Sequence, residues 1–158
     1  MSIITTARER LAILQRTRTA AIVGTSANPA RASNFVATYL AGATEWTIWY
    51  VNPNEAEILG QKVFASLSDL PAAPDVVDTF RRVDDLPTVA EEAIACGAET
   101  LWFQLGLRHD AAAARAAGAG LDVVQDRCLK IEHARFAGGL HLAGFDTGVI
   151  DARRHRLV

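Results

Sequence analysis

The chain is poor in cysteine, has no long apolar run and carries no excess of positive charge. Only two of its 158 residues are cysteine, Cys96 and Cys128, and they lie too far apart for a C-x-x-C motif. No apolar stretch approaches the roughly 18 residues that a membrane-spanning helix requires. A formal net charge of −2 argues against general nucleic-acid binding, which usually leaves a basic excess. We therefore expect neither a membrane nor a nucleic acid as partner.

The N-terminal sequence also lacks the apolar core of a signal peptide. Its first residues, MSIITTARERL, place charges where that core would be needed. Two thiols in a chain without an export signal are typical of a reduced, cytoplasmic protein. We expect the cytoplasm as its location.

Short apolar runs alternate with segments of helical periodicity. The runs predict strands at residues 19–23, 46–51, 76–80, 100–103 and 121–124, with a short edge strand near 62–64. Strands alternating with helices imply right-handed crossovers and a parallel sheet covered on both faces. We predict an α/β fold: a single Rossmann-like domain whose parallel, doubly wound sheet has about five strands.

The helices have recognisable starts and stops. A capping box at Thr6 starts the first helix, Gly42 ends the second and Asp85 caps the third. Gly118 closes the fourth helix, and residues 126–134 form the last.

The length suits one domain, and a chain of this size buries roughly 70% of its unfolded surface, so it needs neither metal nor disulfide for stability. Without any linker, repeat or low-complexity block, we expect a single domain over residues 1–158. The C-terminal extension, residues 138–158, has weak periodicity. We expect it to pack over an edge of the sheet and assign it no role.

The first loop after a strand has chemistry that suits phosphate. In an open parallel sheet, ligands bind outside the carboxyl ends of the strands. This loop runs from Gly24 through Thr25 and Ser26 to Ser33 and precedes a helix, whose positive end favours an anion by only about 0.3–1 kcal/mol. We expect the side chains of Ser26, Ser33 and Arg31 to supply the remaining binding free energy for phosphate. The alternative is that Gly24 only permits a tight turn and Ser33 only caps the helix, because the loop is neither a G-x-G-x-x-G nor a P-loop.

The second strand ends in Asn52 and Pro53, with no acid before Glu55. Folds that bind NAD usually place Asp or Glu here to bind the ribose diol. An acid at this point would repel a phosphorylated ribose, so its absence suits a ligand with phosphate on its ribose. Coenzyme A and NADP are both of that kind.

The third and fourth loops bring aromatic, basic and amide side chains to the same edge. Phe80 and Arg81 follow the third strand, where the ring can stack on adenine and the guanidinium can pair with phosphate. The alternative is a core phenylalanine beside two solvated arginines, Arg81 and Arg82. In the fourth loop Gln104 could face the pocket, and Gly106 would let a ligand approach the backbone.

Five motifs in order carry a family resemblance. They are Val23-Gly24-x-Ser26-x-x-Pro29-x-Arg31-x-Ser33, Val51-Asn52-Pro53, Phe80-Arg81, Trp102-x-Gln104-x-Gly106 and Arg127-Cys128-x-Lys130-Ile131-Glu132-His133. Together they resemble the small stand-alone coenzyme A-binding proteins, whose fold is similar to the N-terminal, coenzyme A-binding domain of the succinyl-coenzyme A synthetase α subunit. The resemblance covers roughly residues 5–136.

The resemblance implies that the nucleotide end of coenzyme A lies across the loops after the first three strands. By that analogy the loop of residues 24–33 holds phosphate, Asn52 and Pro53 flank the nucleotide, and Phe80 with Arg81 lines the adenine side.

It further implies that Gln104 and Gly106 face the pantetheine arm. The synthetase carries its phosphorylated histidine in a second domain, which has no counterpart in these residues, so the resemblance does not carry over ligase activity.

Other reactive side chains fit catalysis less well. Cys128, Glu132 and His133 could suggest a nucleophile, a base or metal ligands. On a helix the adjacent Glu132 and His133 point about 100° apart, which is poor for one metal or one relay. We favour a structural role for residues 127–133, with a mixed disulfide between Cys128 and the coenzyme A thiol as the minor alternative. The Asp146-Thr147-Gly148 triplet matches aspartic proteases, but that chemistry needs two such carboxylates on an all-β scaffold.

The leading hypothesis is therefore a module that binds coenzyme A or an acyl-coenzyme A without catalysing a reaction. One alternative is a Rossmann enzyme or redox sensor that uses NAD(P). The other is one subunit of a split acyl-coenzyme A ligase. The sequence identifies no protein partner.

Overall fold

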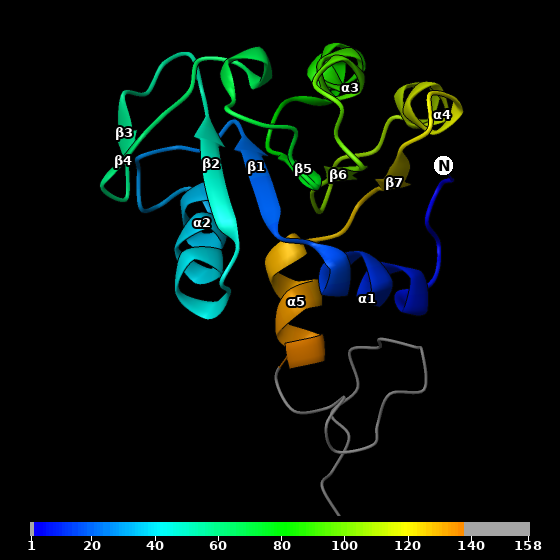
Figure 1. Ribbon diagram of the computed structural model, residues 1–158, viewed down its shortest axis with the longest axis horizontal. Coiled ribbons are helices and arrows are strands. Elements are labelled where there is room, and N and C mark those ends of the chain that lie inside the picture. Colours follow the sequence, from blue (N-terminus) through cyan, green and yellow to red (C-terminus); the bar gives the residue numbers. More distant parts are fainter. Residues whose placement is uncertain (1, 138–158) are drawn as a thin grey trace, which may run out of the picture.

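The computed structural model describes residues 2–137, in which helices cover both faces of one parallel sheet (Figure 1). The strands of this sheet are β1 (Thr19–Val23), β2 (Thr47–Val51), β5 (Val76–Thr79), β6 (Thr100–Phe103) and β7 (Asp122–Val124). Their order across the sheet is β2-β1-β5-β6-β7, and every neighbouring pair is parallel. The predicted α/β, Rossmann-like fold with a five-stranded parallel sheet is confirmed.

Two helical layers bury opposite faces of the sheet, because successive strand residues point to opposite sides. The helices are α1 (Ala7–Arg16), α2 (Ala32–Ala43), α3 (Leu86–Ala95), α4 (Asp110–Gly118) and α5 (Leu129–Ala137). α3 and α4 pack on one face over residues such as Val77 and Phe103. α1, α2 and α5 pack on the other over Ile22, Tyr50 and Trp102. The core thus consists of two apolar layers with the sheet between them.

The region after β2 departs from the prediction of one edge strand. Residues 57–58 and 61–62 form a separate antiparallel pair, β3 (Glu57–Ile58) and β4 (Gln61–Lys62). Within residues 52–75, Phe64 alone bridges to the main sheet, beside Val51. Two short 3-10 helices, η1 (Leu67–Asp69) and η2 (Val83–Asp85), complete the connections.

Two predicted helix ends and one predicted cap differ from the structure. α2 continues through Gly42, and Thr44 ends it by donating its backbone N–H and its hydroxyl to the Leu40 carbonyl. Asp85 stands at the start of α3 but makes no capping bond, because its carboxylate pairs with Arg82 at 3.5 Å. The last helix starts at Leu129, not at residue 126, because Asp126 has a φ of 55° and belongs to a turn.

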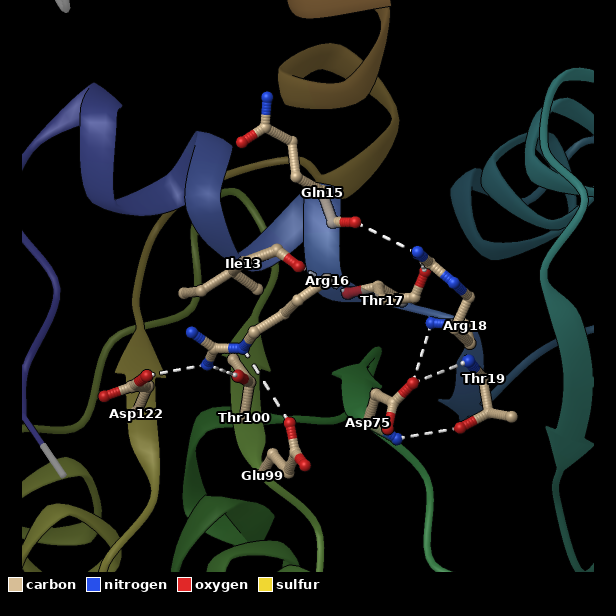
Figure 2. Close-up of polar contacts among 10 residues, drawn as sticks. All are labelled: Ile13, Gln15, Arg16, Thr17, Arg18, Thr19, Asp75, Glu99, Thr100 and Asp122. Carbon is tan, nitrogen blue, oxygen red and sulfur yellow. Dashed lines mark hydrogen bonds and ion pairs between the residues drawn. The ribbon is translucent and has the colours of Figure 1, made fainter.

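Polar contacts at the amino ends of the strands fix their alignment (Figure 2). The Asp75 carboxylate accepts the backbone N–H groups of Arg18 at 2.7 Å and Thr19 at 3.0 Å, which ties the start of β1 to the start of β5. Arg16 at the end of α1 donates to Asp122 of β7 at 2.7 Å. With this end fixed, the carboxyl ends of β1 and β5 emerge level with each other, as the register of the two strands shows.

None of the helices formed by residues 2–137 is both long and apolar enough to cross a membrane. The expected packing of residues 138–158 and the Asp146-Thr147-Gly148 triplet lie outside the described residues. That the whole chain is one domain stays a prediction.

Candidate ligand-binding site

The sheet reverses its direction of growth at β1. β2 lies on one side of β1, and the chain then crosses over to place β5 on the other side. Ligands of open α/β sheets bind at such a switch point, outside the carboxyl ends of the strands. Gly24 and Phe80 are the first residues beyond β1 and β5 here. Each continues its ladder by one bond: the Gly24 N–H donates to Val51 and the Phe80 N–H to Val23, both at 2.8 Å.

Gly24 is required by a close backbone approach. Its φ is +84°, and a Cβ at this position would lie 2.0 Å from the carbonyl oxygen of Phe80. Any side chain would separate the two strand ends or block the space above them. Gly24 therefore does more than permit a turn, because it also lets the loop after β1 approach the loop after β5.

Several polar groups in and around the loop after Gly24 form hydrogen bonds that fix the conformation of the loop itself. The Ser33 hydroxyl accepts the Ser26 N–H at 2.9 Å, so Ser33 fixes the loop and does not merely cap the helix. The buried Thr25 hydroxyl donates to the Ile22 carbonyl at 2.6 Å, and Asn52 donates its side-chain amide to the Thr25 carbonyl at 2.9 Å. Thr25, Ser33 and Asn52 thus hold the loop against β1 and β2.

The start of α2 is electrostatically open to an anion. Arg31 occupies the N-cap but makes no capping bond through its side chain, and the first turn contains no acid. The first N–H groups of a helix have no intrahelical acceptor and carry the positive end of its dipole. A recess of about 360 Å³ lies here, and its lining is Gly24, Ser26, Arg31, Ala32, Ser33 and Phe80.

A larger pocket of about 650 Å³ adjoins this recess, and the two share Ala32 and Phe80. Its walls are mainly apolar, with basic and amide groups among them. The remaining lining residues are Val36, Arg81, Arg82, Asp85, Gln104, Leu105, Leu107, Cys128 and Ile131.

The structure brings together most, but not all, of the predicted site residues. Seven of the eleven line one or both pockets: Gly24, Ser26, Arg31, Ser33, Phe80, Arg81 and Gln104. The other four line neither. Thr25 and Asn52 hold the first loop, Pro53 is exposed, and Gly106 donates its N–H to the Asp126 carboxylate at 2.7 Å. That these residues contact a ligand stays a prediction.

Two acids near the site were not anticipated. Asp78 is fully buried in β5, where Nε2 of Gln104 donates to both its carboxylate oxygens, at 2.7 and 2.8 Å. Burial raises the pKa of Asp78 to about 8, against the lowering effect of the Gln104 and Thr79 N–H groups. Its signal in the sequence is a lone acid inside an apolar parallel strand. Glu55, the first acid after β2, reaches back to accept the Ala27 N–H at 3.3 Å.

The reactive residues of the 127–133 segment point to three different places. Cys128 lines the larger pocket, and burial raises the pKa of its thiol. Glu132 forms a buried ion pair with Arg10 of α1 at 3.0 Å. Nδ1 of His133 lies 2.9 Å from the Tyr39 hydroxyl. Among residues 2–137, no group of three or more His, Cys, Asp or Glu side chains could hold a metal ion.

Comparison with known families decides the classification. A model of the CoA binding domain matches residues 18–134. The chain belongs to the CoA binding domain family. The family predicted from the five loop motifs is thereby confirmed.

This CoA binding domain protein is similar in sequence or in fold to several known proteins. The uncharacterized protein YneT of Bacillus subtilis is 38% identical over 122 residues, which cover 77% of this chain and 90% of YneT. The crystal structure of Prb, a PH1109 protein redesigned for binding, is 36% identical with a TM-score of 0.82, covering 86% of this chain and 95% of Prb. Apo dinucleotide-forming acetyl-coenzyme A synthetase 1 of Korarchaeum cryptofilum is 20% identical with a TM-score of 0.67. The match covers 73% of this chain and 28% of the synthetase, and it shows a shared fold alone.

Replacing Gly24 tests the close approach in this CoA binding domain. We expect Gly24→Ala to lower the free energy of unfolding by more than about 2 kcal/mol, because the positive φ alone costs about 1–2 kcal/mol and the new methyl meets the Phe80 carbonyl. Urea denaturation measures the change. Gly42→Ala is the matched control: it adds the same methyl on α2 with nothing within 4 Å and should stabilise by about 0.5–1 kcal/mol. Equal effects at both positions would contradict the account.

The raised pKa of Asp78 makes stability depend on pH. Between its ordinary pKa near 3.8 and the folded value of about 8, the folded state holds a proton that the unfolded chain has lost. The Asp78 contribution to the free energy of unfolding therefore falls as pH rises, by up to about 1.4 kcal/mol per pH unit. Asp78→Asn has no proton to lose, so its stability relative to the original protein should increase from pH 5 to pH 8. A difference that stays constant across this range would show that the Asp78 pKa is not raised.

Proposed function

We propose that this protein binds coenzyme A or an acyl-coenzyme A, with the phosphates at the first loop and the pantetheine arm in the larger pocket. The observation that carries the proposal is the junction of two unlike spaces at Phe80 and Ala32. One is small and lies at a helix N-terminus, and the other is larger and mainly apolar. A ligand with an anionic head and a long, weakly polar arm fits this pair of spaces, with the head in the recess and the arm in the larger pocket.

The charges at the site support an anion with several phosphates. Arg31 and Arg81 line the two spaces, and neither forms an ion pair with the described part of the chain. Arg82 is paired with Asp85 at a long 3.5 Å. Unpaired guanidinium groups bind phosphate through charge-assisted, often bidentate hydrogen bonds. Together with the open start of α2, they would hold the diphosphate and the ribose phosphate of coenzyme A.

We further propose that binding occurs without catalysis, in the cytoplasm. The groups near the pocket that could act as nucleophile or base are engaged or protonated. The Cys128 pKa is raised by burial, Glu132 is paired with Arg10, and Nδ1 of His133 lies 2.9 Å from the Tyr39 hydroxyl. The two free thiols, Cys96 and Cys128, suit a reducing compartment. This combination supports a carrier, sensor or regulatory module.

A nicotinamide dinucleotide is the competing ligand, and Glu55 is the observation in its favour. Its carboxylate stands beside the first loop, where an acid could bind a ribose diol. That carboxylate already accepts the Ala27 N–H, and it would repel a phosphate placed on the ribose. By that argument Glu55 favours NAD over both NADP and coenzyme A, whereas the larger, mainly apolar pocket favours coenzyme A, whose pantetheine arm it fits.

Ligand selectivity separates these functions. Isothermal titration against coenzyme A, dephospho-coenzyme A, NADP and NAD should show coenzyme A binding most tightly, because it alone combines a ribose phosphate with an arm for the larger pocket. Dephospho-coenzyme A should bind more weakly, and the two dinucleotides more weakly still. Tightest binding of NAD, or no binding of coenzyme A, would refute the proposal.

Arg31 reports which phosphate lies at the helix start. Removing one charge-assisted contact by Arg31→Ala should weaken coenzyme A by about 1.5–3 kcal/mol, measured by the same titration. A larger loss for coenzyme A than for dephospho-coenzyme A places Arg31 on the 3′-phosphate, whereas equal losses place it on the diphosphate. Arg8→Ala is the control, since it removes the same charge from an exposed position of α1 that lines neither pocket. Unchanged affinity in Arg31→Ala would remove this residue from the site.

A further inference from the structure

Asp78 is a carboxyl group in an environment that ordinarily excludes one. It lies in the middle of the sheet, between Ile22 of β1 and Trp102 of β6, and its side chain is completely buried. A charge buried in this way costs the fold free energy unless its hydrogen bonds are satisfied. The side chain that satisfies them is Gln104, which follows β6 and lines the larger pocket.

The contact fixes which end of the Gln104 amide points where. An ionised carboxylate only accepts hydrogen bonds, so it selects the NH₂ end of the amide. Both carboxylate oxygens of Asp78 lie within 2.8 Å of Nε2. The carbonyl oxygen, Oε1, is then turned away. It accepts no hydrogen bond from residues 2–137, and it is not among their buried polar atoms without a partner.

We propose that Asp78 is a positioning residue: its carboxylate holds Nε2 of Gln104, so that Oε1 faces the larger pocket as an acceptor for an N–H donor of the ligand. This inference rests on the proposed function, because the amide groups of the pantetheine arm supply such donors. Asp78 itself does not touch the ligand. It decides whether the pocket offers an acceptor or a donor at this point.

When Asp78 is protonated, it no longer selects the NH₂ end of the Gln104 amide. A protonated carboxyl group has an O–H of its own, which can donate to Oε1 and withdraw the acceptor from the pocket. A ligand that donates to Oε1 therefore binds best when Asp78 is ionised. Because burial raises the pKa of Asp78 to about 8, affinity should rise with pH from 6 to 8 and level off above it.

Other titratable and charged groups lie on this face of the sheet. Burial raises the pKa of Tyr50, Tyr39 and Cys128, which keeps these groups neutral, and lowers the pKa of His133, which favours its neutral form. The charged ones are the buried Arg10–Glu132 pair, Lys130 beside the rings of Phe35 and Tyr39, and the pocket residues Arg81, Arg82 and Asp85.

The test is coenzyme A affinity by isothermal titration at pH 6.0, 7.0, 8.0 and 8.5, for the original protein and for Asp78→Asn. Asparagine keeps the shape but carries both an NH₂ donor and a carbonyl acceptor, so at every pH it can donate to Oε1 and no longer selects the NH₂ end of Gln104. We expect a five- to tenfold weaker affinity in Asp78→Asn at pH 8.5 and a much smaller difference at pH 6.0. Ionisation of the ligand affects both proteins equally and cancels in the ratio.

A second measurement needs no ligand and covers the case in which Asp78→Asn fails to fold. The side-chain amide resonances of Gln104 in the free protein should shift with a midpoint near pH 8, identified by their loss in Gln104→Met. Absence of that titration, or an affinity ratio that is the same at every pH, would overturn the inference and leave the proposed function standing. Failure of the original protein to bind coenzyme A at any pH would overturn both.

Discussion

The approach of Gly24 to the carbonyl of Phe80 is the constraint on which the site depends. It occurs where β1 and β5 end level with each other and their loops depart in opposite directions. The contact is so close that a Cβ at Gly24 would lie 2.0 Å from the carbonyl oxygen of Phe80. It brings the first loop, with its helix N-terminus, to the side of Phe80, and so joins the recess to the larger pocket. Contacts at the opposite end of the strands, above all those of Asp75, keep the two strand ends aligned.

Around this point the polar groups divide into those that build the loop and those that face the pocket. Thr25, Ser33 and Asn52 use their side chains to fix backbone atoms, and a preorganised loop costs less to order when a ligand binds. Arg31 and Arg81 remain unpaired with other described residues, so their charge is available. The positive charge of the site therefore comes from a few arginines and a helix end, in a chain whose formal net charge is −2.

The strands and the family could be predicted from the sequence. Which polar residues hold the loops and which face the pocket could not be predicted. Runs such as residues 19–23 are apolar because both faces of a parallel strand are buried, and this pattern is local. Whether Asn52 turns toward a ligand or toward the Thr25 carbonyl depends on the position of a loop 27 residues away. The same holds for Glu55, which returns to Ala27, and for Asp78, whose partner Gln104 belongs to another strand end. Helix ends at Gly42 and Asp126 were misplaced because capping by Thr44 and a left-handed turn override simple residue preferences.

The most direct test of the account is a crystal structure of the protein with coenzyme A. The account predicts diphosphate oxygens within hydrogen-bonding distance of the backbone N–H groups between Gly24 and Ser33. It also predicts the pantetheine arm running past Phe80 into the pocket beside Gln104. A cofactor bound elsewhere, or bound with its phosphates away from the start of α2, would contradict it.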